Sequence, residues 1–219
     1  MTQKTWTAVD DYISAKLLQP DAALDAAVEA SAAAGLPDIA VAPNQGKLLW
    51  LLARMQGAKR ILEIGTLGGY STIWLARALL PGGKLVTLEY NPKHAEVARA
   101  NIARAGLADV AEVKTGAALD LLPKLNGPFD FFFVDANKDG YPDYFHWALE
   151  LSHPGSVMVF DNVVRNGKVI DAKSTDTLVQ GVRRLDEAIA AEPRVSATAI
   201  RTVGVKGYDG FLIALVTGD

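Results

Sequence analysis

The sequence predicts an α/β fold: a Rossmann-like, doubly wound sheet of seven strands, mostly parallel with one antiparallel strand, with helices added at the N-terminus. Two observations lead to this prediction. From residue 60 onward, short apolar runs alternate with amphipathic stretches, a pattern typical of βαβ units and a parallel sheet. The last two apolar runs are separated only by residues 204–210, which are too few for a crossover helix, so they should form an antiparallel hairpin.

Helical periodicity dominates the first 58 residues. Helices are expected over residues 9–18, 22–34 and 44–55, and Pro43 precedes the third of them as a typical helix start. We therefore predict an N-terminal helical arm over residues 1–58, followed by a Rossmann-like core over residues 59–219. Since no repeat, linker or change of composition separates the two parts, they are expected to form a single domain.

The core is expected to alternate between strands and helices. Its first five strands are predicted at residues 60–64, 84–89, 110–115, 129–135 and 156–161. Helices are predicted at residues 70–80, 92–105, 117–125, 141–151 and 178–191. The closing hairpin is predicted to pair residues 195–203 with residues 211–216.

Composition excludes several classes of function. The chain has 219 residues, with 22 Lys and Arg against 25 Asp and Glu, so it lacks the basic excess typical of proteins that bind a phosphate backbone. It has no cysteine, which excludes disulfides, thiolate nucleophiles and Cys-ligated zinc. The N-terminus resembles no secretory signal, and no apolar run approaches the roughly 18 residues of a membrane span. We expect a soluble cytoplasmic protein with no nucleic-acid or membrane partner.

Acids and glycine turns stand at the carboxyl ends of the predicted strands, where open α/β sheets bind their ligands. Glu63 precedes the turn at Gly65, and glycine there permits close approach of the backbone to a ligand. Glu89 ends the second strand, where a carboxylate can accept both hydroxyls of a ribose. The spacing differs from the dinucleotide motif G-x-G-x-x-G, and an acid precedes the turn. The pattern therefore favours a nucleoside that carries a positive group.

Oxygen ligands end two further strands. Asp135 ends the fourth, and Asp161 with Asn162 ends the fifth; hard divalent cations such as Mg²⁺ prefer such ligands. Lys138 lies three residues after Asp135 and could serve as a general base, because a nearby cation lowers the pKa of an amine. The alternative is that the acids are solvated strand ends or helix caps and that the lysine is an ordinary surface charge.

Three motifs carry a resemblance to a known family. Residues 62–66 read LEIGT, residues 134–138 read VDANK and residues 161–163 read DNV. Together they resemble the cation-dependent O-methyltransferases, the group of catechol and caffeoyl-CoA O-methyltransferases, and especially their small bacterial members. The resemblance implies an S-adenosylmethionine enzyme that methylates a hydroxyl of a catechol-type, vicinal dihydroxy aromatic substrate with Mg²⁺, Mn²⁺ or Ca²⁺. It also implies a homodimer.

The resemblance assigns roles to individual residues. The methionine part of the donor would be bordered by Glu63, Gly65, Thr66 and Ser71, the ribose by Glu89 and the adenine by Ala117. The donor pocket would be completed by Val41, Asp135, Asn137 and Tyr144. The metal would be held by Asp135, Asp161 and Asn162; Lys138 and Asp135 would be catalytic, and the acceptor would contact Lys138 and Asn166.

Two departures from the family pattern affect the expected substrate. Asn137 replaces a second acid, which would weaken one polar contact although an amide can still accept a hydrogen bond. Asn44 and Gln45 replace an acidic pair, and the arm has no basic patch for coenzyme A, so a small free phenol is expected rather than a thioester. A nicotinamide-dependent dehydrogenase and a non-catalytic nucleoside-binding protein stay open as alternatives on the same fold.

Overall fold

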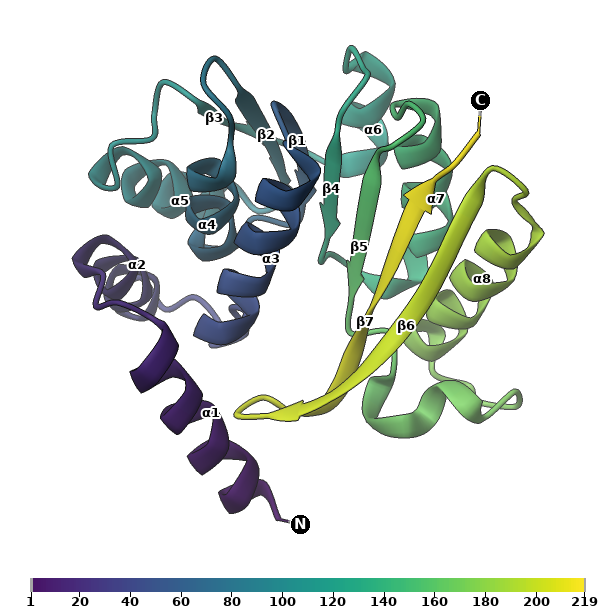
Figure 1. Ribbon diagram of the computed structural model, residues 1–219, viewed down its shortest axis with the longest axis horizontal. Helices are drawn as coiled ribbons and strands as arrows, with labels where there is room; N and C mark the ends of the chain where they lie inside the picture. The colour runs from purple at the N-terminus through teal and green to yellow at the C-terminus, as the bar shows by residue number, and fades with distance from the viewer. Residues whose placement is uncertain (1, 219) are drawn as a thin grey trace.

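A twisted seven-stranded sheet forms the centre of the protein in the computed structural model, which describes residues 2–218 (Figure 1). The strand order is β3-β2-β1-β4-β5-β7-β6. The strands are β1 (Arg60–Ile64), β2 (Lys84–Glu89), β3 (Ala111–Thr115), β4 (Phe131–Val134), β5 (Val157–Asp161), β6 (Val195–Gly204) and β7 (Gly207–Val216). Strands β1 to β5 pair in parallel, whereas β7 runs antiparallel to both β5 and β6. The predicted architecture with one antiparallel strand is confirmed.

Helices cover both faces of the sheet (Figure 1). On one face lie α3 (Pro43–Gln56), α4 (Tyr70–Ala78) and α5 (Pro92–Arg104); on the other lie α6 (Ala118–Leu121), α7 (Tyr141–Glu150) and α8 (Thr177–Ala191). Strand β4 serves both cores, because Phe131 and Phe133 enter the cluster of the first face while Phe132 and Val134 enter that of the second. This alternation is the two-residue period of a strand that is buried on both sides.

The N-terminal arm begins earlier than expected. Helix α1 (Gln3–Leu17) starts six residues before the predicted position because the Thr2 side chain accepts a hydrogen bond from the Thr5 amide and caps the helix. It buries no residue and lies beside the β6–β7 turn (Figure 1). By contrast, α2 (Ala22–Ala33) and α3 contribute Leu24 and Leu49 to the core. No helix in the described part of the chain is long and apolar enough to cross a membrane.

The closing hairpin is longer than the sequence predicts. Residues 207–210, expected in the connection, pair with residues 201–204, so that only Val205 and Lys206 remain in the turn. Gly207 has a φ of 96°, which suits the tight return of the chain. Because the segment from Gly207 to Gly210 is glycine-rich and half polar, its strand character depends on the partner strand rather than on apolar alternation.

Candidate active site

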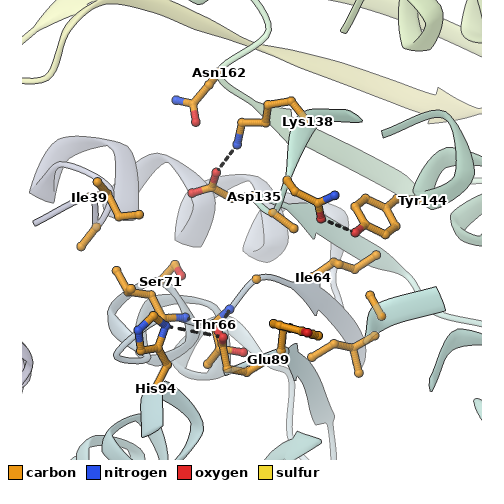
Figure 2. A pocket seen from close by; sticks show the side chains of 18 of the residues that line it. Ile39, Ile64, Thr66, Ser71, Glu89, His94, Asp135, Lys138, Tyr144 and Asn162 are labelled. Carbon is orange, nitrogen blue, oxygen red and sulfur yellow. Dashed lines mark hydrogen bonds and ion pairs between the residues drawn. The ribbon is translucent and has the colours of Figure 1, made fainter. Parts of the chain in front are cut away.

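A cavity of about 810 Å³ opens at the carboxyl ends of the parallel strands (Figure 2). It collects eleven of the residues that the sequence singles out: Val41, Gly65, Thr66, Ser71, Glu89, Ala117, Asp135, Asn137, Lys138, Tyr144 and Asn162. Figure 2 shows Asp135, Lys138 and Asn162 grouped toward one end, and Glu89 with His94 toward the other. A cavity of this size can accommodate a nucleoside and a second small molecule.

The turn after β1 brings the backbone close to the neighbouring strand. Gly65 has a φ of 98°, and a Cβ atom placed on it would lie 2.2 Å from the carbonyl oxygen of Asp135. Only glycine fits this position, both because of the left-handed backbone and because of the close approach. The turn therefore forms a side-chain-free wall between β1 and β4.

Glu89 organises the same turn from β2. One carboxylate oxygen, Oε2, accepts hydrogen bonds from the backbone amides of Thr66 (3.1 Å) and Leu67 (2.8 Å). The other, Oε1, accepts the Asn91 amide at 2.8 Å and lies 3.6 Å from Nδ1 of His94. These bonds hold the carboxylate in one orientation on the cavity wall, as a site that accepts two hydroxyl groups requires.

Glu63 lies behind the wall rather than on it. Its carboxylate is fully buried and accepts hydrogen bonds from the hydroxyls of Ser71, at 2.6 Å, and Thr72. Burial raises the pKa of this carboxyl to about 7, although the hydroxyl donors oppose the shift. The structure thus places Glu63 where it orients Ser71, and it is Ser71 that faces the cavity.

Lys138 and Asp135 form an ion pair at the opposite end. The Lys138 Nζ atom lies 2.7 Å from Asp135 Oδ1, and the lysine is only 7% exposed, so it is not the surface charge of the alternative interpretation (Figure 2). Nearby, Asn137 accepts a hydrogen bond from the Tyr144 hydroxyl and donates one to Asp139 at 2.6 Å. The amide at position 137 is therefore engaged in two contacts despite the expected weakening.

Asp161 adds a second buried carboxylate, from the end of β5. Its Oδ1 accepts the Asn162 amide at 2.8 Å, and its Oδ2 accepts the Gln45 side-chain amide at 2.7 Å. Burial and the negative charge of Asp135 raise the pKa of Asp161 to about 7. Asp161 lines a smaller cavity of about 270 Å³ beside the β6–β7 hairpin, and Asn162 lines both cavities. The cavities therefore meet at the predicted metal ligands.

The segment after β5 places one residue of the predicted acceptor site outside both cavities. Asn166 is exposed and lines neither cavity, whereas its neighbour Arg165 lines the larger one. Both residues have left-handed backbones, with φ of 56° and 55°, and this tight turn directs adjacent side chains apart. Gln45 was not predicted as a partner of Asp161, and its only signal in the sequence is the departure from the acidic pair at positions 44 and 45.

Comparison with known proteins gives consistent matches. Residues 13–215 match the O-methyltransferase family. A catechol O-methyltransferase of Niastella koreensis is 53% identical over 220 aligned residues, which cover 99% of this chain and 100% of the relative. The crystal structure of an O-methyltransferase from Bacillus cereus in complex with SAH superposes with a TM-score of 0.98 at 58% identity, covering 99% of this chain and 100% of the other. A Streptomyces achromogenes O-methyltransferase involved in tomaymycin synthesis, in complex with SAM, has a TM-score of 0.97 at 55% identity and covers 100% of both chains.

Proposed function

Because this chain belongs to the O-methyltransferase family, we propose that it transfers the methyl group of S-adenosylmethionine to one hydroxyl of a catechol-type, vicinal dihydroxy aromatic substrate, in a reaction that requires a divalent metal ion. Family membership disfavours the dehydrogenase and the non-catalytic nucleoside-binding protein. The observation that carries the proposal is the grouping of Lys138, Asp135 and Asn162 at one end of a cavity large enough for the donor.

The donor occupies the larger cavity in this proposal. Glu89 would accept the ribose hydroxyls, and Gly65, Thr66 and Ser71 would border the methionine part. Ala117 would lie against the adenine, and the remaining wall would be formed by Val41, Asp135, Asn137 and Tyr144. The rigid hold of Glu89 by backbone amides supports this assignment, as do the SAH and SAM complexes of the Bacillus cereus and Streptomyces achromogenes proteins.

The residues at the metal end fit a hard divalent cation. Within residues 2–218, Asp161 forms no ion pair although it is only 5% exposed, and Asp135 pairs with Lys138 alone. Burial and the negative charge of Asp135 raise the pKa of Asp161, so bringing these two carboxylates together is costly without a further positive charge. Asp135, Asp161 and Asn162 would hold Mg²⁺, Mn²⁺ or Ca²⁺ through oxygen atoms. A bound cation would supply the positive charge that favours ionisation of an acceptor hydroxyl.

The side chains of the protein then position and deprotonate the acceptor. In its neutral amine form, Lys138 Nζ is the group that would take the hydroxyl proton and become an ammonium ion, since it lies at the metal end on the wall of the donor cavity. Asp135 holds that nitrogen at 2.7 Å and fixes its direction. Methyl transfer from a sulfonium to an oxyanion neutralises charge, so positioning accounts for most of the expected acceleration.

A small free phenol is favoured over a coenzyme A thioester. The smaller cavity carries three acids, Asp10, Asp161 and Asp209, and one lysine, Lys206, which is paired with Asp38 at 3.1 Å. This charge distribution would repel the phosphate groups of coenzyme A. The wall beside the metal end therefore supports a compact phenolic acceptor.

The expected homodimer is supported by apolar side chains on the N-terminal helices. Tyr12 and Leu17 on α1 and Met55 on α3 are 66%, 71% and 73% exposed, so these large apolar side chains are available for a subunit contact. Light scattering should give about twice the mass of one chain; a mass of one chain at micromolar concentration would contradict the assignment.

The experiment that tests the function is methyl transfer from S-adenosylmethionine to caffeic acid, with Mg²⁺ and then with EDTA. We expect product only with the metal, and we expect Asp161→Ala to abolish metal-stimulated turnover while S-adenosylmethionine still binds in calorimetry. Full turnover in EDTA, or an unimpaired Asp161→Ala enzyme, would refute the metal site. Binding of the donor without any transfer would instead refute the acceptor class.

A further inference from the structure

Arg165 is held in a strained conformation at the end of the donor cavity. It has a φ of 56°, in the left-handed region that non-glycine residues seldom adopt. The Asp209 Oδ1 atom accepts the backbone amides of Val164 and Arg165, each at 2.9 Å, and so holds this turn in place. A strained backbone that is held in place by hydrogen bonds to a side chain, here the Asp209 carboxylate, is typical of functional positions.

The guanidinium group of Arg165 has no acidic partner within residues 2–218. Its Nε atom is buried and makes no hydrogen bond to any described residue. Arg77 and Arg194 form ion pairs with Asp21 and Glu192, and five further arginines donate side-chain hydrogen bonds to uncharged oxygen atoms: Arg60, Arg99, Arg104, Arg183 and Arg184. Asp209, which holds the Arg165 backbone amide, uses its Oδ1 on backbone amides and not on the guanidinium. A buried nitrogen without a hydrogen-bond acceptor is costly unless a ligand supplies one.

Arg165 belongs to the acceptor end of the cavity. It lines the same cavity as Lys138 and Asn162, and it follows β5 by four residues. Arg165 also lies only three residues after Asn162, one of the proposed metal ligands, and both residues line this cavity.

The methionine carboxylate of the donor is a poor partner for this cation. The turn that would hold the methionine part follows β1, whereas Arg165 follows β5, and β4 lies between these two strands. Two strand spacings amount to about 10 Å. The anion that Arg165 can reach is therefore one carried by the acceptor.

We infer that Arg165 is a specificity residue that binds a carboxylate on the acceptor, so that the preferred substrates are anionic catechols, that is, dihydroxylated aromatic acids. The inference rests on the proposed function. The planar guanidinium presents a fork of donors that matches a carboxylate, and the interaction is strengthened by low solvent exposure. The carboxylate would also give the buried Nε atom of Arg165 the hydrogen-bond acceptor that it lacks among the described residues.

The test compares acids with their neutral amides. The ratio of kcat/KM for caffeic acid to that for caffeamide, and the same ratio for protocatechuic acid and 3,4-dihydroxybenzamide, would be measured for the wild-type enzyme, Arg165→Gln and Arg165→Lys. Loss of a charge-assisted hydrogen bond predicts that at least one ratio falls about 10- to 100-fold in Arg165→Gln, with a smaller fall in Arg165→Lys. Lys168→Gln is the matched control, because Lys168 is an exposed cation of the same segment that lines neither cavity; its ratios should match the wild type.

The outcomes separate this inference from the proposed function. If all catechols are methylated but both ratios are the same in Arg165→Gln as in the wild type, the inference is wrong and the function stands. If Arg165→Gln instead weakens the calorimetric affinity for S-adenosylmethionine tenfold, the guanidinium serves the donor and the inference is again wrong. If no catechol is methylated by the wild type, the proposed function itself fails.

Discussion

The hydroxyl of Tyr141 joins the ends of the two strands that carry the metal-end acids. The residue is fully buried, and its oxygen lies 2.7 Å from the carbonyl oxygen of Asp161 and 3.1 Å from that of Val134. The ring packs edge-to-face on Phe160, with centroids 5.5 Å apart. Tyr141→Phe should therefore keep the ring packing and remove only the hydrogen bonds that the hydroxyl donates to the carbonyl groups at the ends of β4 and β5.

The expected cost follows from this geometry. Removing the donor leaves two buried carbonyl groups with fewer partners, which costs about 1–3 kcal/mol of the free energy of unfolding. For a chain of this size, each kcal/mol lowers Tm by about 2–4 °C. Asp135 directly follows β4, and Asp161 is the last residue of β5, so a looser junction between these strand ends would displace both proposed metal ligands. We therefore also expect a higher Mg²⁺ concentration for half-maximal activity. The affinity for S-adenosylmethionine should change much less.

Urea unfolding monitored by circular dichroism measures the cost, and isothermal calorimetry measures both ligands. Tyr90→Phe is the matched control for unfolding without donor, because Tyr90 is 78% exposed and loss of its hydroxyl should change the free energy of unfolding by no more than about 0.5 kcal/mol. If Tyr141→Phe unfolds at the same urea concentration as Tyr90→Phe, the Tyr141 hydroxyl does not join the strands and the prediction is wrong.

Two further predictions concern backbone geometry and pH. Gly65→Ala should lose at least about 2 kcal/mol of stability and most donor affinity, because its Cβ would lie 2.2 Å from the Asp135 carbonyl oxygen; Gly82→Ala, with a φ of 79° but open space around the Cβ, should lose only about 1–2 kcal/mol in thermal melts and bind the donor normally. The His153–Asp130 pair, 2.9 Å apart, raises the pKa of His153 above 6.5 and lowers that of Asp130 below 3.8. The contribution of this pair to the free energy of unfolding should therefore be full between about pH 4 and 6.5. It should disappear as the pH rises through the folded-state pKa of His153, and also as the pH falls through the folded-state pKa of Asp130. His153→Gln should accordingly be more destabilised relative to wild type at pH 5.5 than at pH 8.5 in urea titrations; an equal difference at both values would contradict the ion pair.

Features that depend on local sequence were predicted correctly, and features that depend on contacts between distant segments were not. The apolar periodicity and the acids at strand ends placed Asp135, Lys138 and Asn162 correctly at one edge of the sheet, because parallel strands bring their carboxyl ends together whatever the details of packing. The same local rules could not foresee that Val205 and Lys206 alone make the last turn, since pairing of glycine-rich residues depends on the partner strand.

By itself, the sequence determined the doubly wound architecture, the single antiparallel strand and the protein family that the three motifs indicate, because periodicity, turn residues and motifs are local features of a few neighbouring positions. Only the tertiary structure decided which side chains meet. Gln45 reaches Asp161 across 116 residues, Glu63 lies behind Ser71, and the left-handed turn sends Arg165 into the cavity and Asn166 out of it. These contacts depend on strand order, helix docking and a backbone reversal, which are decided when the segments pack together and not by the local spacing of residue types.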